Sequence, residues 1–222
     1  MRSYAQFCPV ARALDVIGER WALLIVRELL IGPCRFTDLR DGLPGIASNL
    51  LAERLRSLEQ AGVIERAELP PPAASTVYRV TERGRALVPV IVELAVWGAP
   101  LLESGRGEDH FFGRWMTLLE VAVFRGVSTA GVAPLLVELR VDGEAARLDV
   151  REDGVGMATS EAGTPDVVFI ADAGTAARVL MRDLEVNDAV EQGLAEVIGE
   201  PDAADRLRTL VGRVEGFRSS PA

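Results

Sequence analysis

The chain has 222 residues, of which 49% are hydrophobic and 26% are charged, and its formal net charge is −9. This composition indicates a folded protein of one large or two ordinary domains, and no window approaches the roughly twenty apolar residues of a membrane span. Two cysteines are too few for a disulfide framework and are typical of a reducing compartment. The N-terminal stretch lacks a basic start followed by an apolar run, so we expect no export signal, no membrane partner and a cytoplasmic location.

The negative charge is concentrated in the second half of the chain. Residues 1–85 carry 12 arginines and 10 acids, a net +2, whereas residues 107–222 carry 11 arginines and 21 acids, a net −10. The chain contains no lysine, a bias that we attribute to a GC-rich bacterial genome. The asymmetry predicts two domains with different roles and is compatible with a basic face on the first.

Two apolar helices are expected at the start of the chain. Pro9 opens the first, which runs to Gly18, because a proline at the first helical position loses no hydrogen bond. Residues 19–31 form the second, and Gly32-Pro33 ends it.

The segment from Phe36 to Gly62 predicts a helix-turn-helix. Its turn is Pro44-Gly45-Ile46. The second helix places Leu51, Leu55 and Leu58 on one face, at steps of four and three residues. A helix that buries leucines and presents polar side chains near its start is suited to reading base edges in the major groove.

A wing and a long helix follow. Residues 63–69 and 77–80 alternate apolar and polar side chains, and the turn between them, 70–75, is proline-rich and uncharged. Thr81 is a suitable N-cap for a helix over residues 81–102. Its apolar stripe is longer than one small domain needs, which is typical of a helix with a partner.

The remaining chain predicts a second, α+β domain. We expect a linker at residues 103–108 and a domain over 109–217. Its expected helices are 111–125, 173–182, 186–193 and 202–214, and its expected strands are 135–141, 146–151, 155–158 and 167–171. Asp142-Gly143 is a hairpin turn between the first two strands.

The N-terminal half resembles the HxlR family of bacterial winged-helix regulators. The motifs that carry the resemblance are Cys8-Pro9-Val10, Ile17-Gly18 with Arg20-Trp21, Arg35-Phe36-Thr37-Asp38-Leu39, Leu43-Pro44-Gly45-Ile46, Leu51-Ala52-Glu53-Arg54-Leu55 and Glu59-Gln60-Ala61-Gly62. The resemblance implies a winged helix-turn-helix domain over residues 1–102. It also implies a homodimer that pairs through its terminal helices and binds a pseudo-palindromic operator on double-stranded DNA.

The C-terminal half resembles sterol-carrier-protein-like domains. The motifs are residues 165–172, in which a strand leads into Asp172 and a helix, and the Gly199-Glu200-Pro201 turn before the last helix. The resemblance implies an α+β fold around an apolar tunnel and an apolar small-molecule effector. The candidate pocket residues are Trp115, Met116, Leu119, Phe124, Met157 and Phe169.

The candidate DNA contacts lie around the predicted recognition helix. Asn49 suits adenine, and Arg56 suits guanine or phosphate. Arg54 projects toward the flank of the helix, where a phosphate is the expected partner. The other candidates are Ser48 on the recognition helix, Arg35 and Thr37 at the start of the preceding helix, and Arg66 and Arg79 on the wing.

Cys8 is the candidate redox thiol, because a cysteine at a helix N-terminus gains thiolate character from the helix dipole. The alternative is that Cys8 packs as a small apolar residue beneath the dimer helices. The resemblance to HxlR regulators, some of which sense oxidants at this position, keeps both readings open.

No catalytic set, phosphate-binding glycine loop or metal-ligand spacing is visible, and His110 is the only histidine. We therefore expect no enzyme activity, no metal and no cofactor. The favoured hypothesis is a dimeric DNA-binding regulator controlled by a small molecule in its C-terminal domain. The alternatives are a small-molecule carrier with a vestigial DNA domain and a regulator that senses redox state through Cys8.

Overall fold

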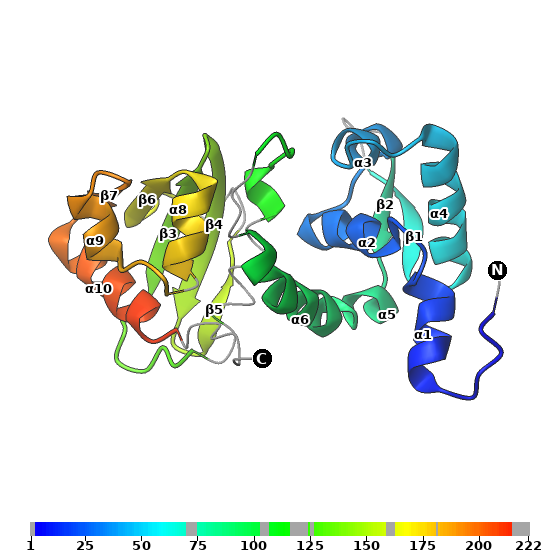
Figure 1. Cartoon of the computed structure of the whole chain (residues 1–222), viewed down its shortest axis with the longest axis horizontal. Helices are drawn as coiled ribbons and strands as arrows, with labels where there is room; N and C mark the ends of the chain where they lie inside the picture. Colours follow the sequence, from blue (N-terminus) through cyan, green and yellow to red (C-terminus); the bar gives the residue numbers. More distant parts are fainter. Residues whose placement is uncertain are drawn as a thin grey trace. The chain divides into compact units, whose positions relative to one another are not determined.

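The computed structural model describes residues 3–69, 75–102, 107–115, 124, 127–158, 163–180 and 182–214. Its contacts divide the chain into two compact units, Met1–Ile91 and Val92–Ala222, with the α+β composition that the sequence predicts (Figure 1). The division falls inside helix α6 (Val88–Gly98), earlier than the predicted boundary at residue 102. Residues 103–106 of the predicted linker lie outside the described residues.

The first unit has the element order of a winged helix-turn-helix. The elements are α1 (Pro9–Ile17), α2 (Ala22–Ile31), α3 (Phe36–Asp41), α4 (Ser48–Gln60), β1 (Ile64–Glu68), β2 (Thr76–Val80) and α5 (Glu82–Arg85). Strands β1 and β2 pair antiparallel, as a wing requires. The predicted wing tip, 70–74, lies outside the described residues.

The wing is tied to the start of the helix-turn-helix through the backbone of Cys34. Its N–H donates to the Tyr78 carbonyl at 3.0 Å, and the Tyr78 N–H donates back at 2.8 Å. At the other end of the wing, the Thr81 hydroxyl caps α5 by accepting from Gly84 N–H at 3.1 Å. A Cβ on Gly84 would overlap the Val63 carbonyl, so only glycine permits this close approach.

Two helix predictions that begin in this unit were wrong in their extent. The second helix begins at Ala22 instead of residue 19, because Trp21 takes a left-handed conformation with φ 80°. The predicted continuous helix over 81–102 is broken into α5, α6 and the 3-10 turn η1 (Ala99–Leu102). Pro89 and Pro100 account for the breaks, since neither has an N–H to donate to the preceding turn.

The second unit is built on a five-stranded sheet. Its strands are β3 (Leu135–Val141), β4 (Glu144–Arg151), β5 (Gly154–Met157), β6 (Val167–Ala171) and β7 (Ala195–Gly199), in the order β5-β4-β3-β6-β7. Strands β3 and β6 run parallel, and the other neighbours run antiparallel. The Asp142-Gly143 hairpin is confirmed, with φ of 50° and 83° and with Val141 paired to Glu144.

Three helices pack on one face of this sheet, as Figure 1 shows: α8 (Ala173–Leu180), α9 (Val186–Glu191) and α10 (Pro201–Gly212). Strand β7 was not predicted from the sequence, so one edge of the sheet was missed. Of the predicted helix over 111–125, the described residues show the 3-10 turn η2 (Gly113–Trp115) and a helical Phe124, and residues 116–123 and 125 lie outside the described residues.

A buried carboxylate lies on the opposite face of the sheet. Glu138 on β3 is only 4% exposed. It accepts hydrogen bonds from Arg140 Nε and from Arg147 Nε, its cross-strand neighbour, each at 2.7 Å. Burial alone would raise the pKa of Glu138, but the hydrogen bonds and charges of the two arginines outweigh it and lower this pKa below its ordinary value of 4.5.

The lowered pKa of Glu138 predicts acid sensitivity of the second unit. The unfolded carboxyl takes up a proton more readily than the folded one, so the stabilisation is present above pH 4.5 and is lost as the pH falls through the folded pKa. We expect Glu138→Gln to lower the free energy of unfolding at pH 7 by about 1–3 kcal/mol and to flatten its dependence on pH below 4.5. Urea unfolding at several pH values measures both effects. Asp149→Asn, at an exposed ion pair with Arg151, is the control; an equal effect there would contradict the assignment.

Candidate nucleic-acid interface

The helix α4 is held in the first unit by one apolar face. Leu51, Leu55 and Leu58 are each at most 1% exposed, which confirms the predicted buried side of this helix. Together they remove enough apolar surface from water to contribute about 5 kcal/mol or more to anchoring the helix. The turn before α4 is also fixed, because Ile46 N–H donates to the Leu43 carbonyl at 3.1 Å and Leu43 is buried.

The opposite face of α4 is exposed and polar. Ser48, Asn49 and Arg56 lie on it, as the sequence predicts. The Asn49 side-chain oxygen accepts from Leu50 N–H at 2.9 Å, which holds the amide at the start of the helix. Within the described parts of the chain, no carboxylate forms an ion pair with Arg56, so its guanidinium is available to a partner.

Arg54 is placed differently from these residues. Its side chain is only 13% exposed and pairs with Glu19 at 2.9 Å and with Glu53 at 2.9 Å. Its Nε also donates to the Arg20 carbonyl at 3.3 Å. The phosphate contact expected for Arg54 therefore meets competition from three acceptors of the protein itself.

The start of α3 holds two further candidates. Arg35 and Thr37 are exposed. The Arg35 N–H is already satisfied by Asp38 Oδ2 at 2.9 Å, and Arg35 Nε donates to Ser75 Oγ at 3.1 Å. A phosphate at this position would bind the exposed guanidinium rather than the capped N–H.

The wing contributes two half-exposed arginines. Arg66 lies 3.5 Å from Glu59 and stacks over the Tyr78 ring, with its guanidinium carbon 5.5 Å from the ring centroid. Arg79 pairs with Glu65 at 2.7 Å. Exposed pairs of this kind are weak, so a phosphate can replace the carboxylate at small cost.

The α1–α2 junction lies against the helix-turn-helix. Gly45 in the turn has φ 87°, and a Cβ there would meet the Trp21 ring at 4.0 Å. The left-handed Trp21 carries the Arg20 guanidinium over its ring at 5.4 Å. Sequence reasoning did not identify Trp21 or Glu19 as part of the site. The only available indication was the place of Trp21 in one of the motifs that resemble the HxlR family.

Cys8 lies at the N-cap of α1 and is partly exposed. Its side chain makes no capping hydrogen bond, and its carbonyl accepts from Arg12 N–H at 3.0 Å. Cys34 is also partly exposed, and its thiol donates to the Gly32 carbonyl at 3.4 Å.

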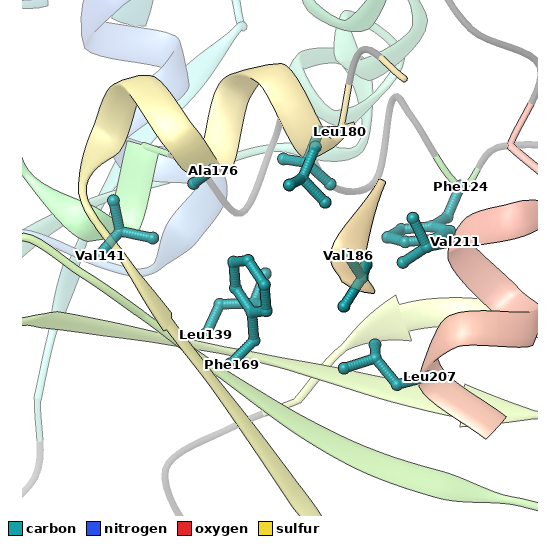
Figure 2. A pocket seen from close by; sticks show the side chains of 10 residues that line it. Phe124, Leu139, Val141, Phe169, Ala176, Leu180, Val186, Leu207 and Val211 are labelled. Carbon is teal, nitrogen blue, oxygen red and sulfur yellow. The ribbon is translucent and has the colours of Figure 1, made fainter. Parts of the chain in front are cut away.

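Two of the six predicted pocket residues, Phe124 and Phe169, line a small void in the core of the second unit. Figure 2 shows side chains from the sheet and the three helices turned toward it, among them Phe124 and Phe169. The cavity volume is about 20 Å³, which is room for about one water molecule. Trp115 does not line it and instead meets Phe112 edge-on, with ring centroids 4.9 Å apart. Met116, Leu119 and the side chain of Met157 lie outside the described residues.

The described residues were also searched for metal sites and membrane-spanning helices. No group of three or more histidine, cysteine, aspartate or glutamate side chains there is arranged to hold a metal ion. None of the described helices is long and apolar enough to cross a membrane. His110 is exposed, as expected for a surface residue.

Comparison with known proteins finds relatives for the first unit. The HxlR-like helix-turn-helix family matches residues 16–106. The chain is 34% identical to the HTH-type transcriptional regulator YvaP of Bacillus subtilis over 100 residues, which are 45% of this chain and 93% of YvaP. It is 38% identical to YodB of the same organism over 99 residues, which are 44% of this chain and 88% of YodB.

Solved structures of YodB have also been matched. The reduced form, at 38% identity, covers 45% of this chain and 99% of YodB with a TM-score of 0.39. The quinone-bound form, at 36% identity, covers 42% of this chain and 99% of YodB with a TM-score of 0.37. The family match ends at residue 106 and leaves most of the second unit outside it. Through its N-terminal half, the chain belongs to the HxlR-like family of helix-turn-helix transcriptional regulators.

Proposed function

We propose that the protein is a homodimeric regulator that inserts α4 into the major groove of a pseudo-palindromic operator. The observation that carries this proposal is the two-sided character of α4, in which three buried leucines anchor the helix and Ser48, Asn49 and Arg56 face solvent. Asn49 is suited to adenine and Arg56 to guanine or phosphate. Arg35, Thr37, Arg66 and Arg79 are proposed to hold the flanking phosphates.

The net charge of −9 does not oppose this proposal, because the acids lie mainly beyond residue 106. The DNA-binding unit itself is weakly basic, so a single copy is expected to bind weakly. Two copies at a fixed spacing would add their contacts, which is the usual route to a specific site.

Replacing the exposed side chains of α4 is expected to weaken operator binding. Arg56→Ala and Asn49→Ala should each cost about 1–3 kcal/mol of binding free energy, because each removes a contact to a base or phosphate. Fluorescence anisotropy with the DNA upstream of the chain's own gene measures the effect. Glu82→Gln, an exposed change on α5, is the matched control. Unchanged binding in the double variant Asn49→Ala/Arg56→Ala would remove the site assignment.

The homodimer is supported by apolar side chains that the single chain leaves exposed. Leu94, Trp97 and Leu101 follow one another at helical spacing and are 47%, 75% and 69% exposed. A second set, Phe7 and Val10, surrounds the start of α1. Exposed apolar surface of this extent is typical of a surface that is covered by a partner.

Native mass spectrometry tests both the dimer and the effector. We expect the purified protein to have twice the mass of one chain, and Leu94→Asp/Trp97→Asp to have the mass of one, because two buried charges would oppose association. Val190→Asp, at an exposed apolar side chain on α9, should remain dimeric. A monomeric wild type would contradict the proposal, and additional mass on the wild type would report a bound ligand.

The sterol-carrier-like fold and the apolar effector are the finer part of the proposal. The mixed sheet with three helices on one face and the wholly apolar lining of the core void support them. A cavity of about 20 Å³ is far below the roughly 300 Å³ that small-molecule sites occupy. Binding of a lipid-like ligand therefore requires the helices to move away from the sheet.

A second candidate function is thiol-based regulation through Cys8. Two observations favour it: Cys8 lies partly exposed at the N-terminus of α1, and its sequence relative YodB has been solved in quinone-bound and diamide-treated forms. A modified thiol at this position would alter the exposed surface around Phe7 and Val10.

Cys8→Ser separates thiol regulation from ligand control. If Cys8 is the sensor, diamide should lower the operator affinity of the wild type and of Cys34→Ser, but not that of Cys8→Ser, because diamide takes two electrons and two protons from a pair of thiols to form a disulfide and the Cys8 thiols of the two copies supply that pair. Anisotropy titration before and after treatment is the measurement. An equal response in all three proteins would exclude Cys8 as the input.

A further inference from the structure

We propose that Arg54 is a positioning residue that fastens the recognition helix to the α1–α2 junction and makes no contact with DNA phosphates. This inference rests on the proposed function of α4 as the reader. It concerns a residue whose place on the flank of α4 suggests a phosphate contact, and it assigns the opposite role.

The first argument is that protein acceptors already engage every nitrogen of the Arg54 guanidinium. Each of its three nitrogens has an acceptor: Nη2 with Glu19 at 2.9 Å, Nη1 with Glu53 at 2.9 Å, and Nε with the Arg20 carbonyl at 3.3 Å. Its 13% exposure contrasts with Arg56, which is exposed. A phosphate would have to displace these partners and draw out a largely buried side chain.

The second argument is local charge. Two carboxylates, Glu19 and Glu53, meet the one guanidinium of Arg54, so the cluster carries a net negative charge. A negative cluster repels the phosphate backbone, whose attraction to a protein comes from arginines and lysines that replace counterions. The cluster is therefore suited to holding protein elements together.

The third argument is the position of the contacts between the α1–α2 junction and the helix-turn-helix. Arg54 joins the body of α4 to the junction, and the Trp21 ring lies against Gly45 in the turn that precedes α4. Two attachments, one at the turn and one on the helix, fix the direction of α4 relative to α1. The left-handed backbone of Trp21 places its ring and the Glu19 carboxylate on the same side of the junction, toward the helix-turn-helix.

The consequence is a direct mechanical path from α1 to the reader. Helix α1 starts at Cys8 and the exposed Phe7, and it ends at Ile17, two residues before Glu19. A displacement of α1 is transmitted to α4 through the Glu19–Arg54 pair. Through this pair, a partner that covers the start of α1, or a modification there, would change the affinity for the operator.

The test measures, in full-length variants, whether each substitution strengthens or weakens operator binding and how binding depends on salt. Anisotropy titrations at several salt concentrations give the dissociation constant and the slope of log K against log salt. We expect Arg54→Gln and Glu19→Gln each to weaken binding by about tenfold, within the usual range of coupling between sites, with the slope of the wild type. Arg56→Ala, the phosphate or base contact, should instead lower the slope by about 1 if it binds phosphate.

A phosphate role for Arg54 predicts the reverse. Glu19→Gln would then free Arg54 and tighten binding, and Arg54→Gln would lower the salt slope by about 1. Either result would overturn the inference. Because Glu19 is half-exposed in the α1–α2 junction, its variant is expected to fold and can still decide the question if Arg54→Gln does not fold.

Exchanging the charges of Arg54 and Glu19 tests whether their pairing restores operator affinity. Arg54→Glu alone places three carboxylates together and is expected to weaken binding strongly. Adding Glu19→Arg restores an opposite-charge pair, and we expect it to recover most of the lost affinity. No recovery would contradict the positioning role. Absence of any operator binding by the wild type would instead reject the proposed function itself.

Discussion

The burial of one face of α4 is the constraint on which the rest of the first unit depends. Leu51, Leu55 and Leu58 lock the helix into the core, and this leaves its opposite face as the only surface that α4 can present to DNA. The wing, the turn at Gly45 and the α1–α2 junction are all arranged around the anchored helix. A helix that was merely amphipathic, without these attachments, would place its side chains too loosely to distinguish base edges.

Most of the elements could be predicted from the sequence, because they depend on local patterns. The leucine spacing of α4, the Thr81 cap and the Asp142-Gly143 hairpin all appear where their residue types predict. Pro89 also carried enough information to predict the break after α5, but the apolar stripe around it suggested one continuous helix. Strand β7 was missed because it is a half-exposed edge strand whose pairing with β6 is supplied by the sheet.

The candidate site was only partly predictable for the same reason. The exposed positions Ser48, Asn49 and Arg56 follow from helical periodicity alone. The contacts of Arg54 cannot be predicted from this periodicity, since its main partner, Glu19, is 35 positions away in the sequence. Helical periodicity places Arg54 on a flank, and only the packed structure determines which charges reach that flank first. The left-handed Trp21 is likewise a tertiary feature with no local indication.

The second unit has its own core and its own charge balance. Its apolar side chains fill one face of the sheet almost completely, and a buried Glu138 with two arginines stabilises the other. Such a unit is well suited to fold independently, which is consistent with an input domain attached to a DNA-binding output domain. At the apolar void among the described core residues, an effector larger than about one water molecule would have to separate the helices from the sheet.

Hydroxyl-radical footprinting of the operator by the full-length protein tests the central claim most directly. If two copies of α4 read the two halves of a pseudo-palindrome, the footprint should show two protected regions whose centres are about one helical turn, or 10–10.5 base pairs, or a multiple of it, apart. A single protected region, or weak uniform protection without sequence preference, would contradict the account.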